Sequence, residues 1–242
     1  MSSCPWLTAQ PIAHRGYHDM NSKVWENTLS AFSRAIDAGF AIECDLQYAA
    51  DGVPVVFHDE DLQRLCNIAG RTRDKTSGEL ALLSVGGTKD RVPTLKQMLQ
   101  LVNGRVPLVI ELKDGGEDDE GFAASVLDTL DGYEGDVALM SFKSDFLREF
   151  RELGCERPIG LTAEGGRAET WEPHFATLDI GFDFISYQAM HLPNPFIDEA
   201  RKRGIAVITW TVRDALARQK TKEFADQMTF EGFDPRTLDK EE

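Results

Sequence analysis

The fold of this 242-residue chain is decided by one stretch, Phe40-Ala41-Ile42-Glu43-Cys44-Asp45-Leu46-Gln47-Tyr48-Ala49-Ala50-Asp51-Gly52-Val53-Pro54-Val55-Val56-Phe57-His58-Asp59. Its two apolar runs, 40–46 and 53–58, predict strands, and the short link between them ends in Ala50-Asp51-Gly52, a hairpin signal. Parallel neighbours need a crossover of about a dozen residues, so the second run is expected to return antiparallel to the first. That return brings His58 toward Glu43 and Asp45, which share one face of the first strand because strand side chains alternate.

Outward from this stretch, strand-like runs alternate with helical patterns. The strand candidates are 11–14, 40–46, 53–58, 107–112, 136–141, 157–161, 183–187, 205–211 and 227–230, and the helical patterns cover 27–38, 94–102, 122–130, 145–153, 195–203 and 213–224. Such alternation indicates a parallel sheet, and setting the hairpin excursion aside leaves eight parallel strands. We therefore expect an α/β fold, a (β/α)8 TIM-type barrel with the hairpin and a small insertion, about 59–91, after the second strand. The whole chain, 1–242, reads as a single domain with a polar tail from about 235 to 242.

Composition and charge limit the classes of function. The net charge of −15 argues against nucleic acid or an anionic membrane surface as a partner, so an anionic substrate needs local cations or a metal. The four cysteines have neither CxxC spacing nor a histidine at zinc-finger distance and are expected to be reduced. With no signal peptide and no apolar run of about 18 residues, we expect a cytoplasmic protein without a stable membrane anchor.

Two further polar clusters follow apolar runs. His14-Arg15-Gly16 follows the first strand candidate, and Glu111-Leu112-Lys113 ends the candidate at 107–112. Carboxylates inside apolar stretches are costly to bury unless their charge is offset, and a divalent cation held by Glu43, Asp45 and Glu111 would offset it. Histidines and cationic side chains beside such a cation suit chemistry on a phosphate ester.

Each cluster also has a simpler interpretation. His14 could be a half-buried histidine in a turn, and His58 could cap the end of the hairpin. Glu43 and Asp45 could lie on the solvent-facing side of an edge strand, and Glu111 and Lys113 could form a surface ion pair. Singly these interpretations are favoured; together they are not, because every cluster falls on the face where barrel enzymes build active sites. The remaining candidates are expected to be ordinary: His18, His174 and His191 as loop residues, Cys44 as packing, and 117–120 as a solvated helix start, with a weak second cation site left open there.

The ordered motifs resemble those of the glycerophosphodiester phosphodiesterases. The resemblance rests on His14-Arg15-Gly16, Glu26-Asn27-Thr28, Glu43-Cys44-Asp45, Asp51 to Asp59, Glu111-Leu112-Lys113 and Trp210-Thr211-Val212, and it extends from Ile12 to about Phe233. The chain departs from the family pattern at two places. Arg213 stands where the family often has Asn, and Thr229-Phe230-Glu231 stands where it often has a Thr-Asp pair.

The resemblance implies a phospholipase-C-like barrel that hydrolyses a glycerophosphodiester to glycerol 3-phosphate and an alcohol. It implies roles for the following residues: Glu43, Asp45 and Glu111 as ligands of one divalent cation (Ca²⁺ or Mg²⁺, with Mn²⁺ as a further candidate), His14 and His58 as the acid–base pair, and Arg15 and Lys113 as phosphate contacts. Glu26 and Asn27 would orient Arg15 or the phosphate from a helix start. Trp210 would give an apolar wall to the glycerol or the leaving group.

Two other functions compete with this one. A phospholipase D acting on lysophospholipids would use the same histidines and carboxylates but would need a wide apolar mouth. A non-catalytic barrel that binds a phosphoryl ligand would not need all of these groups. The sequence specifies a small-molecule partner but not the leaving alcohol, the metal or the oligomeric state. Arg213 is expected on the rim, either as a solvated first-turn residue or as a contact to an anionic leaving group.

Overall fold

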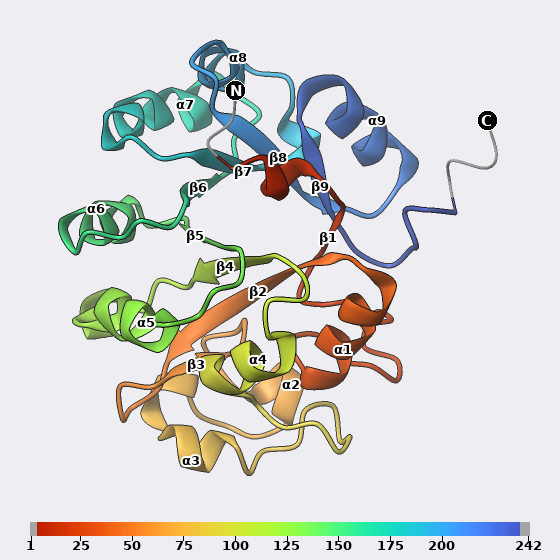
Figure 1. Cartoon of the computed structure of the whole chain (residues 1–242), viewed down its shortest axis with the longest axis vertical. Coiled ribbons are helices and arrows are strands. Elements are labelled where there is room, and N and C mark those ends of the chain that lie inside the picture. Colours follow the sequence, from red (N-terminus) through yellow and green to blue (C-terminus); the bar gives the residue numbers. More distant parts are fainter. Residues whose placement is uncertain (1–3, 238–242) are drawn as a thin grey trace.

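Eight parallel strands form a closed barrel in the computed structural model, which describes residues 4–237 apart from the side chains of 117 and 118 (Figure 1). With the antiparallel strand β3, which lies outside the ring, the described residues form nine strands: β1 (Ile12–Ala13), β2 (Ala41–Tyr48), β3 (Pro54–Val56), β4 (Leu108–Leu112), β5 (Val137–Ser141), β6 (Ile159–Ala163), β7 (Phe184–Gln188), β8 (Ala206–Val212) and β9 (Gln227–Phe230). Their order is β1-β9-β8-β7-β6-β5-β4-β2-β3, and the β1–β2 pairing closes the ring. The expected (β/α)8 fold is confirmed.

The strand that is not part of the ring is β3, which pairs antiparallel with β2. Leu46 lies opposite Val56, and the amide of Phe57 donates to the carbonyl of Asp45 at 3.0 Å. The hairpin prediction was therefore correct, and it leaves His58 beside the carboxyl end of β2. Because β3 occupies this place outside the ring, β4 rather than β3 is the parallel neighbour of β2.

Helices surround the barrel, and those of eight or more residues each bury one face. The helices are α1 (Leu29–Ala38), α2 (Gln63–Cys66), α3 (Ser77–Leu80), α4 (Leu95–Val102), α5 (Phe122–Leu130), α6 (Ser144–Glu152), α7 (Ala168–Trp171), α8 (Pro195–Lys202) and α9 (Ala215–Phe224). Local chemistry sets their ends: the Thr94 side chain accepts from the Gln97 amide at the start of α4, and Gly39 takes a left-handed conformation after α1. The main core lies between this helical layer and the outer face of the strands.

Three segments differ from the expected pattern. Between β6 and β7 the chain forms α7 and a 3₁₀ helix, Glu172–Ile180, where the sequence has little periodicity. The insertion carries α2 and α3 over its own apolar cluster, which includes Val55, Leu65 and Leu80. The last long helix, α9, begins at Ala215 because the Asp214 side chain caps it by accepting from the Ala217 amide at 2.9 Å.

The described part of the chain after β9 is attached to the barrel. Pro235 is buried, and Arg236 donates to the Ala38 carbonyl at 3.1 Å and lies over the ring of Phe40. Most of the tail expected from about 235, residues 238–242, lies outside the described residues. None of the helices among residues 4–237 is both long and apolar enough to cross a membrane.

Candidate active site

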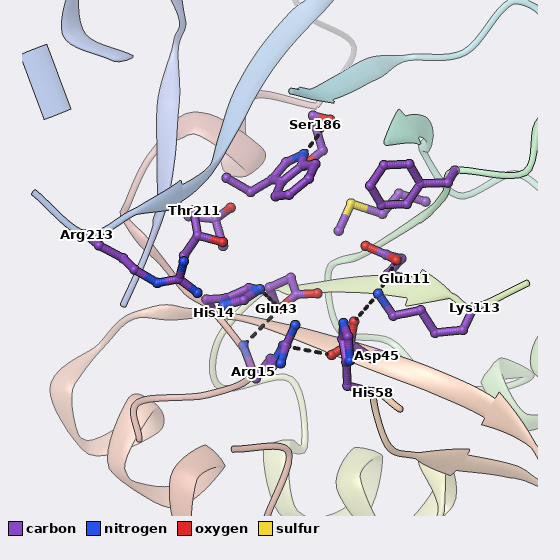
Figure 2. A pocket seen from close by; sticks show the side chains of 14 residues that line it. His14, Arg15, Glu43, Asp45, His58, Glu111, Lys113, Ser186, Thr211 and Arg213 are labelled. Carbon is purple, nitrogen blue, oxygen red and sulfur yellow. Dashed lines mark hydrogen bonds and ion pairs between the residues drawn. The ribbon is translucent and has the colours of Figure 1, made fainter. Parts of the chain in front are cut away.

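Three buried carboxylates meet at the carboxyl ends of two neighbouring strands. Glu43 and Asp45 extend from β2 and Glu111 from β4, and one oxygen of each lies within 4.8 Å of the others (Figure 2). The parallel register places Asp45 directly beside Glu111, and strand alternation places Glu43 on the same face as Asp45. The sequence-based prediction that these three side chains come together is confirmed.

Cationic and amide groups compensate two of these carboxylates much better than the third. Lys113 lies between Asp45, at 2.8 Å, and Glu111, to which it also donates. Asp45 further contacts the Arg15 guanidinium at 3.2 Å and accepts from the Asn27 amide at 2.8 Å. Among the described residues, the side chain of Glu43 accepts one hydrogen bond, from the backbone amide of Arg15 at 2.8 Å, and its ion-pair partner is Nε2 of His14, 3.9 Å away.

The ionisation of the three carboxyl groups follows this unequal compensation. Burial and the neighbouring charges of Asp45 and Glu111 raise the pKa of Glu43 well above its usual range. Burial likewise raises the pKa of Glu111, partly offset by Lys113. Burial alone would raise the pKa of Asp45 too, but Lys113 and Arg15 bring it well below its ordinary value. The cluster is therefore short of positive charge at Glu43.

Arg15 and Asn27 reach Asp45 from a strained turn. Both adopt left-handed backbone conformations, with φ of 54° each, although neither is glycine. Such conformations are unfavourable by about 1 kcal/mol per residue, so surrounding contacts must hold them. The backbone amide of Asn27 donates to the backbone carbonyl of Arg15 at 2.9 Å, while the backbone amide of Arg15 donates to the Glu43 carboxylate. The strain is thus located where a backbone donor and a guanidinium face the acidic cluster.

His14 is held by a residue that the sequence analysis did not assign to the site. Its Nδ1 lies 2.5 Å from Oε2 of Glu231, and its Nε2 lies 3.9 Å from Glu43. Burial lowers the pKa of His14 despite the carboxylate. Burial would by itself raise the pKa of Glu231, but His14 and Arg213 lower it to about 2. The available signal was the position of Glu231 immediately after the last predicted strand.

His58 has a comparable partner in the adjacent residue. Its Nδ1 is 2.7 Å from Asp59, and Arg64 of α2 donates to both oxygens of Asp59 at 2.6 and 2.8 Å. Arg64 also makes two 2.8 Å hydrogen bonds to Glu26, which in turn pairs with Arg15 at 2.6 Å. The insertion therefore connects His58 to Arg15 through Arg64, a residue that no local motif identified.

One pocket of about 290 Å³ is lined by both histidines, by the three carboxylates, and by Arg15 and Lys113. The residues that hold these groups, Glu26, Asn27, Asp59, Arg64 and Glu231, are not part of its lining. The pocket is also lined by Met140, Phe142, Ser186, Trp210, Thr211, Arg213 and Thr229. The Trp210 indole donates to the Ser186 carbonyl at 3.1 Å and packs edge-on against Phe142 at 5.5 Å, which gives one apolar wall. Trp210 and Thr211 both line the pocket because the β8–β9 register shifts between Thr209 and Val212.

Three expectations for other polar residues need correction or refinement. His18 is buried rather than an ordinary loop residue, and neither of its ring nitrogens has a hydrogen-bond partner in the described part of the chain. Asp119 is also buried and pairs at 3.2 Å with both Arg73 and Lys143, so it is not part of a solvated helix start. Arg213 lies on the pocket rim as expected, but its guanidinium is paired with Glu231 at 3.2 Å.

The comparisons with known proteins agree with this geometry. The model of the glycerophosphoryl diester phosphodiesterase family matches residues 14–233. The chain is 32% identical to a glycerophosphodiester phosphodiesterase of Caldanaerobacter subterraneus subsp. tengcongensis, covering 83% of this chain and 84% of that protein. A glycerophosphodiester phosphodiesterase of Thermotoga maritima has a similar structure, with a TM-score of 0.74 and 27% identity over 90% of this chain and 92% of the other. An Oleispira antarctica phosphodiesterase, solved with sn-glycerol-3-phosphate, shares the fold with a TM-score of 0.81 at 23% identity, covering 96% of this chain and 95% of that one.

Proposed function

The chain belongs to the glycerophosphoryl diester phosphodiesterase family, and we propose on this basis that it hydrolyses glycerophosphodiesters to glycerol 3-phosphate and a free alcohol. One observation carries the proposal: buried carboxylates, two histidines and two cationic side chains line a single pocket at the carboxyl end of the barrel. That end is where barrel enzymes carry out their chemistry. A binding scaffold would have no need for carboxylates that are buried without full compensation.

We assign one divalent cation to Glu43, Asp45 and Glu111. The three residues offer only oxygen donors, which suits Ca²⁺, Mg²⁺ or Mn²⁺ rather than a softer metal. The raised pKa of Glu43 supports the assignment, because it is the behaviour expected of an acidic cluster that lacks a counter-charge. When bound, such a cation supplies positive charge that polarises a phosphoryl oxygen.

Arg15 and Lys113 are the phosphate contacts in this proposal. Each lines the pocket while pairing with the acidic cluster, so each can shift a donor toward an incoming phosphodiester. Three carboxylates and these two cations leave the cluster at minus one; a divalent cation and a singly charged phosphodiester bring the total to zero. Glu26 orients Arg15 by accepting a hydrogen bond from its guanidinium. Asn27 acts through Asp45, the carboxylate that pairs with both Arg15 and Lys113.

His14 and His58 serve as the proton-transfer pair. Each ring is held through Nδ1 by a carboxylate, which leaves Nε2 available to the pocket. We assign His14 as the base, because the lowered pKa keeps it neutral near pH 7, so that it takes a proton from the attacking water. His58 then gives a proton to the leaving alcohol oxygen as the bond from that oxygen to phosphorus breaks.

The apolar wall accommodates carbon rather than charge. Trp210 and Phe142 flank the pocket, and Phe142 remains 47% exposed. This wall favours the glycerol carbons or the start of a longer substituent. It is also the one observation that supports a second candidate, a phospholipase D acting on lysophospholipids, whose acyl chain would extend along Phe142.

The experiment is a substrate panel for the purified full-length chain. Glycerophosphocholine, glycerophosphoethanolamine and lysophosphatidylcholine are each tested with Ca²⁺, Mg²⁺, Mn²⁺ or chelator. Glycerol 3-phosphate from the deacylated diesters is measured enzymatically, and lysophosphatidic acid, the product that a phospholipase D would release from the lysophospholipid, is measured by mass spectrometry. We expect glycerol 3-phosphate from the two deacylated diesters, only with a divalent cation, and none from the variant Glu111→Gln. Turnover of the lysophospholipid alone would favour the second candidate, and full activity in chelator would refute the metal assignment.

A further inference from the structure

A row of three side chains crosses the end of the barrel where its first and last strands meet. In the β1–β9 ladder Ala13 pairs with Phe230, and the His14 amide donates to the Phe230 carbonyl at 3.0 Å. The next residues along the two strands, His14 and Glu231, are therefore neighbours by backbone register. In the β8–β9 ladder Val212 pairs with Phe230, and the Glu231 amide donates to the Val212 carbonyl at 3.1 Å, which places Arg213 on the other side of Glu231.

The side chains of this row are bonded in sequence. Oε2 of Glu231 lies 2.5 Å from Nδ1 of His14, and the Arg213 guanidinium donates to Oε1 at 3.3 Å and to Oε2 at 3.2 Å. One further group faces this carboxylate, His18, whose Nε2 is 4.0 Å from Oε2 and too distant for a hydrogen bond. Glu231 is buried, so water does not compete strongly for its oxygens. The carboxylate is thus fixed between one arginine and one histidine.

We propose that Glu231, anchored by Arg213, is a positioning residue that holds His14 as the Nδ1–H tautomer with its Nε2 lone pair directed into the pocket. The inference deepens the proposed function, on which its catalytic consequence rests. An ionised carboxylate only accepts, so the 2.5 Å contact requires the proton on Nδ1. Nε2 of neutral His14 then has no proton and makes no hydrogen bond to Glu43 at 3.9 Å, which leaves it free to accept one from water.

The geometry also accounts for Arg213 beside this carboxylate. Glu231 has the reach to bond His14 while its two oxygens face Arg213. An unpaired carboxylate in this buried position would be unfavourable, and the adjacent guanidinium removes that penalty. Arg213 is therefore explained by its contact with Glu231, and it does not have to contact substrate.

Kinetics of matched variants test the consequence for catalysis. Glu231→Gln keeps the shape but lets its NH₂ group donate to Nδ1, which stabilises the wrong tautomer. We expect kcat for glycerophosphocholine to fall by about 10²-fold, with KM changed by less than about threefold, because substrate contacts are untouched. Arg213→Gln, which leaves the carboxylate in place, is expected to lose about fivefold. The control Glu223→Gln makes the same charge change at an exposed site on α9 and is expected to match the wild type.

The tautomer itself is measured without activity. In ¹⁵N-histidine-labelled protein, with His14 assigned from the spectrum of His14→Gln, we expect a protonated Nδ1 and an unprotonated Nε2, and a loss of that state in Glu231→Gln. An unprotonated Nδ1 in the wild type, or a folded Glu231→Gln with kcat within twofold of wild type, overturns the inference. If the wild type hydrolyses no diester, the proposed function fails while the wild-type spectrum still decides the tautomer. If the Glu231→Gln variant does not fold, the wild-type spectrum still shows which nitrogen of His14 carries the proton.

Discussion

Replacing Glu43 by glutamine should stabilise the metal-free protein. Its carboxylate lies within 4.8 Å of those of Asp45 and Glu111, and at an effective dielectric constant of about 20 each such pair repels by roughly 3.5 kcal/mol. Arg15 offsets part of this repulsion, and we expect Glu43→Gln to stabilise the fold by about 2 kcal/mol. For a chain of this length that gain corresponds to a Tm about 4–8 °C higher.

The assay is thermal unfolding followed by circular dichroism, in chelator and with saturating cation. A ligand at about 100 times its Kd adds about 2.7 kcal/mol, so wild type should gain about 5–10 °C from Ca²⁺, Mg²⁺ or Mn²⁺. Glu43→Gln should start higher and gain little. Asp45→Asn is the matched comparison: it removes the acceptor of Arg15, Lys113 and Asn27, so it should be less stable than wild type by about 3–5 kcal/mol.

The pH dependence has a definite sign. The folded pKa of Glu43 is above its unfolded value, so ionising this group destabilises the fold. The advantage of Glu43→Gln in chelator should therefore be absent below the usual glutamate pKa, about 4.5, and grow as the pH rises toward the raised value. A variant that melts at or below the wild type in chelator at neutral pH, or that keeps the full cation-induced increase, would refute this account of the cluster.

Three further predictions concern the groups around the cluster. His14→Ala and His58→Ala should each lower kcat by about 10²–10⁴-fold, and a nitrophenyl leaving group should restore activity only to His58→Ala; comparable losses on both substrates would contradict the assigned roles. Hydrogen bonds from Arg64 help to lower the pKa of Glu26 to about 2 despite its burial, so Glu26→Gln should cost about 3 kcal/mol in urea unfolding at pH 7. That deficit should shrink as the pH falls from about 4.5 toward 2, and a pH-independent deficit would exclude this origin. Trp210→Ala should raise KM more than it lowers kcat, whereas an unchanged KM would remove the indole from the substrate wall.

Local sequence rules were sufficient to predict those site residues that lie on the same strand or the same hairpin. Alternation along a strand put Glu43 and Asp45 on the same face, and a hairpin signal too short for a crossover brought His58 back to them. Alignment of the carboxyl ends of parallel strands then added Glu111. These steps depend on backbone geometry alone, which is why the barrel and the acidic cluster could both be predicted.

Sequence reasoning did not identify residues whose role depends on distant pairing. Glu231 is 217 positions from His14, so nothing near either residue shows that they are bonded. Arg64 lies in an insertion without periodicity, and only the folded chain brings it to Glu26, 38 positions away. Asp119 belongs to an acidic run whose composition is typical of an exposed segment, yet Arg73 of the insertion forms an ion pair with it.

The pairing of the first and last strands also affects how activity arises during synthesis. The cluster of Glu43, Asp45 and Glu111 is complete once β4 has been made, whereas His14 obtains its carboxylate only when the final strand docks. A nascent chain on the ribosome therefore contains all three carboxylates long before it contains the partner of His14. Proteolysis between α9 and Glu231 would separate His14 from that carboxylate.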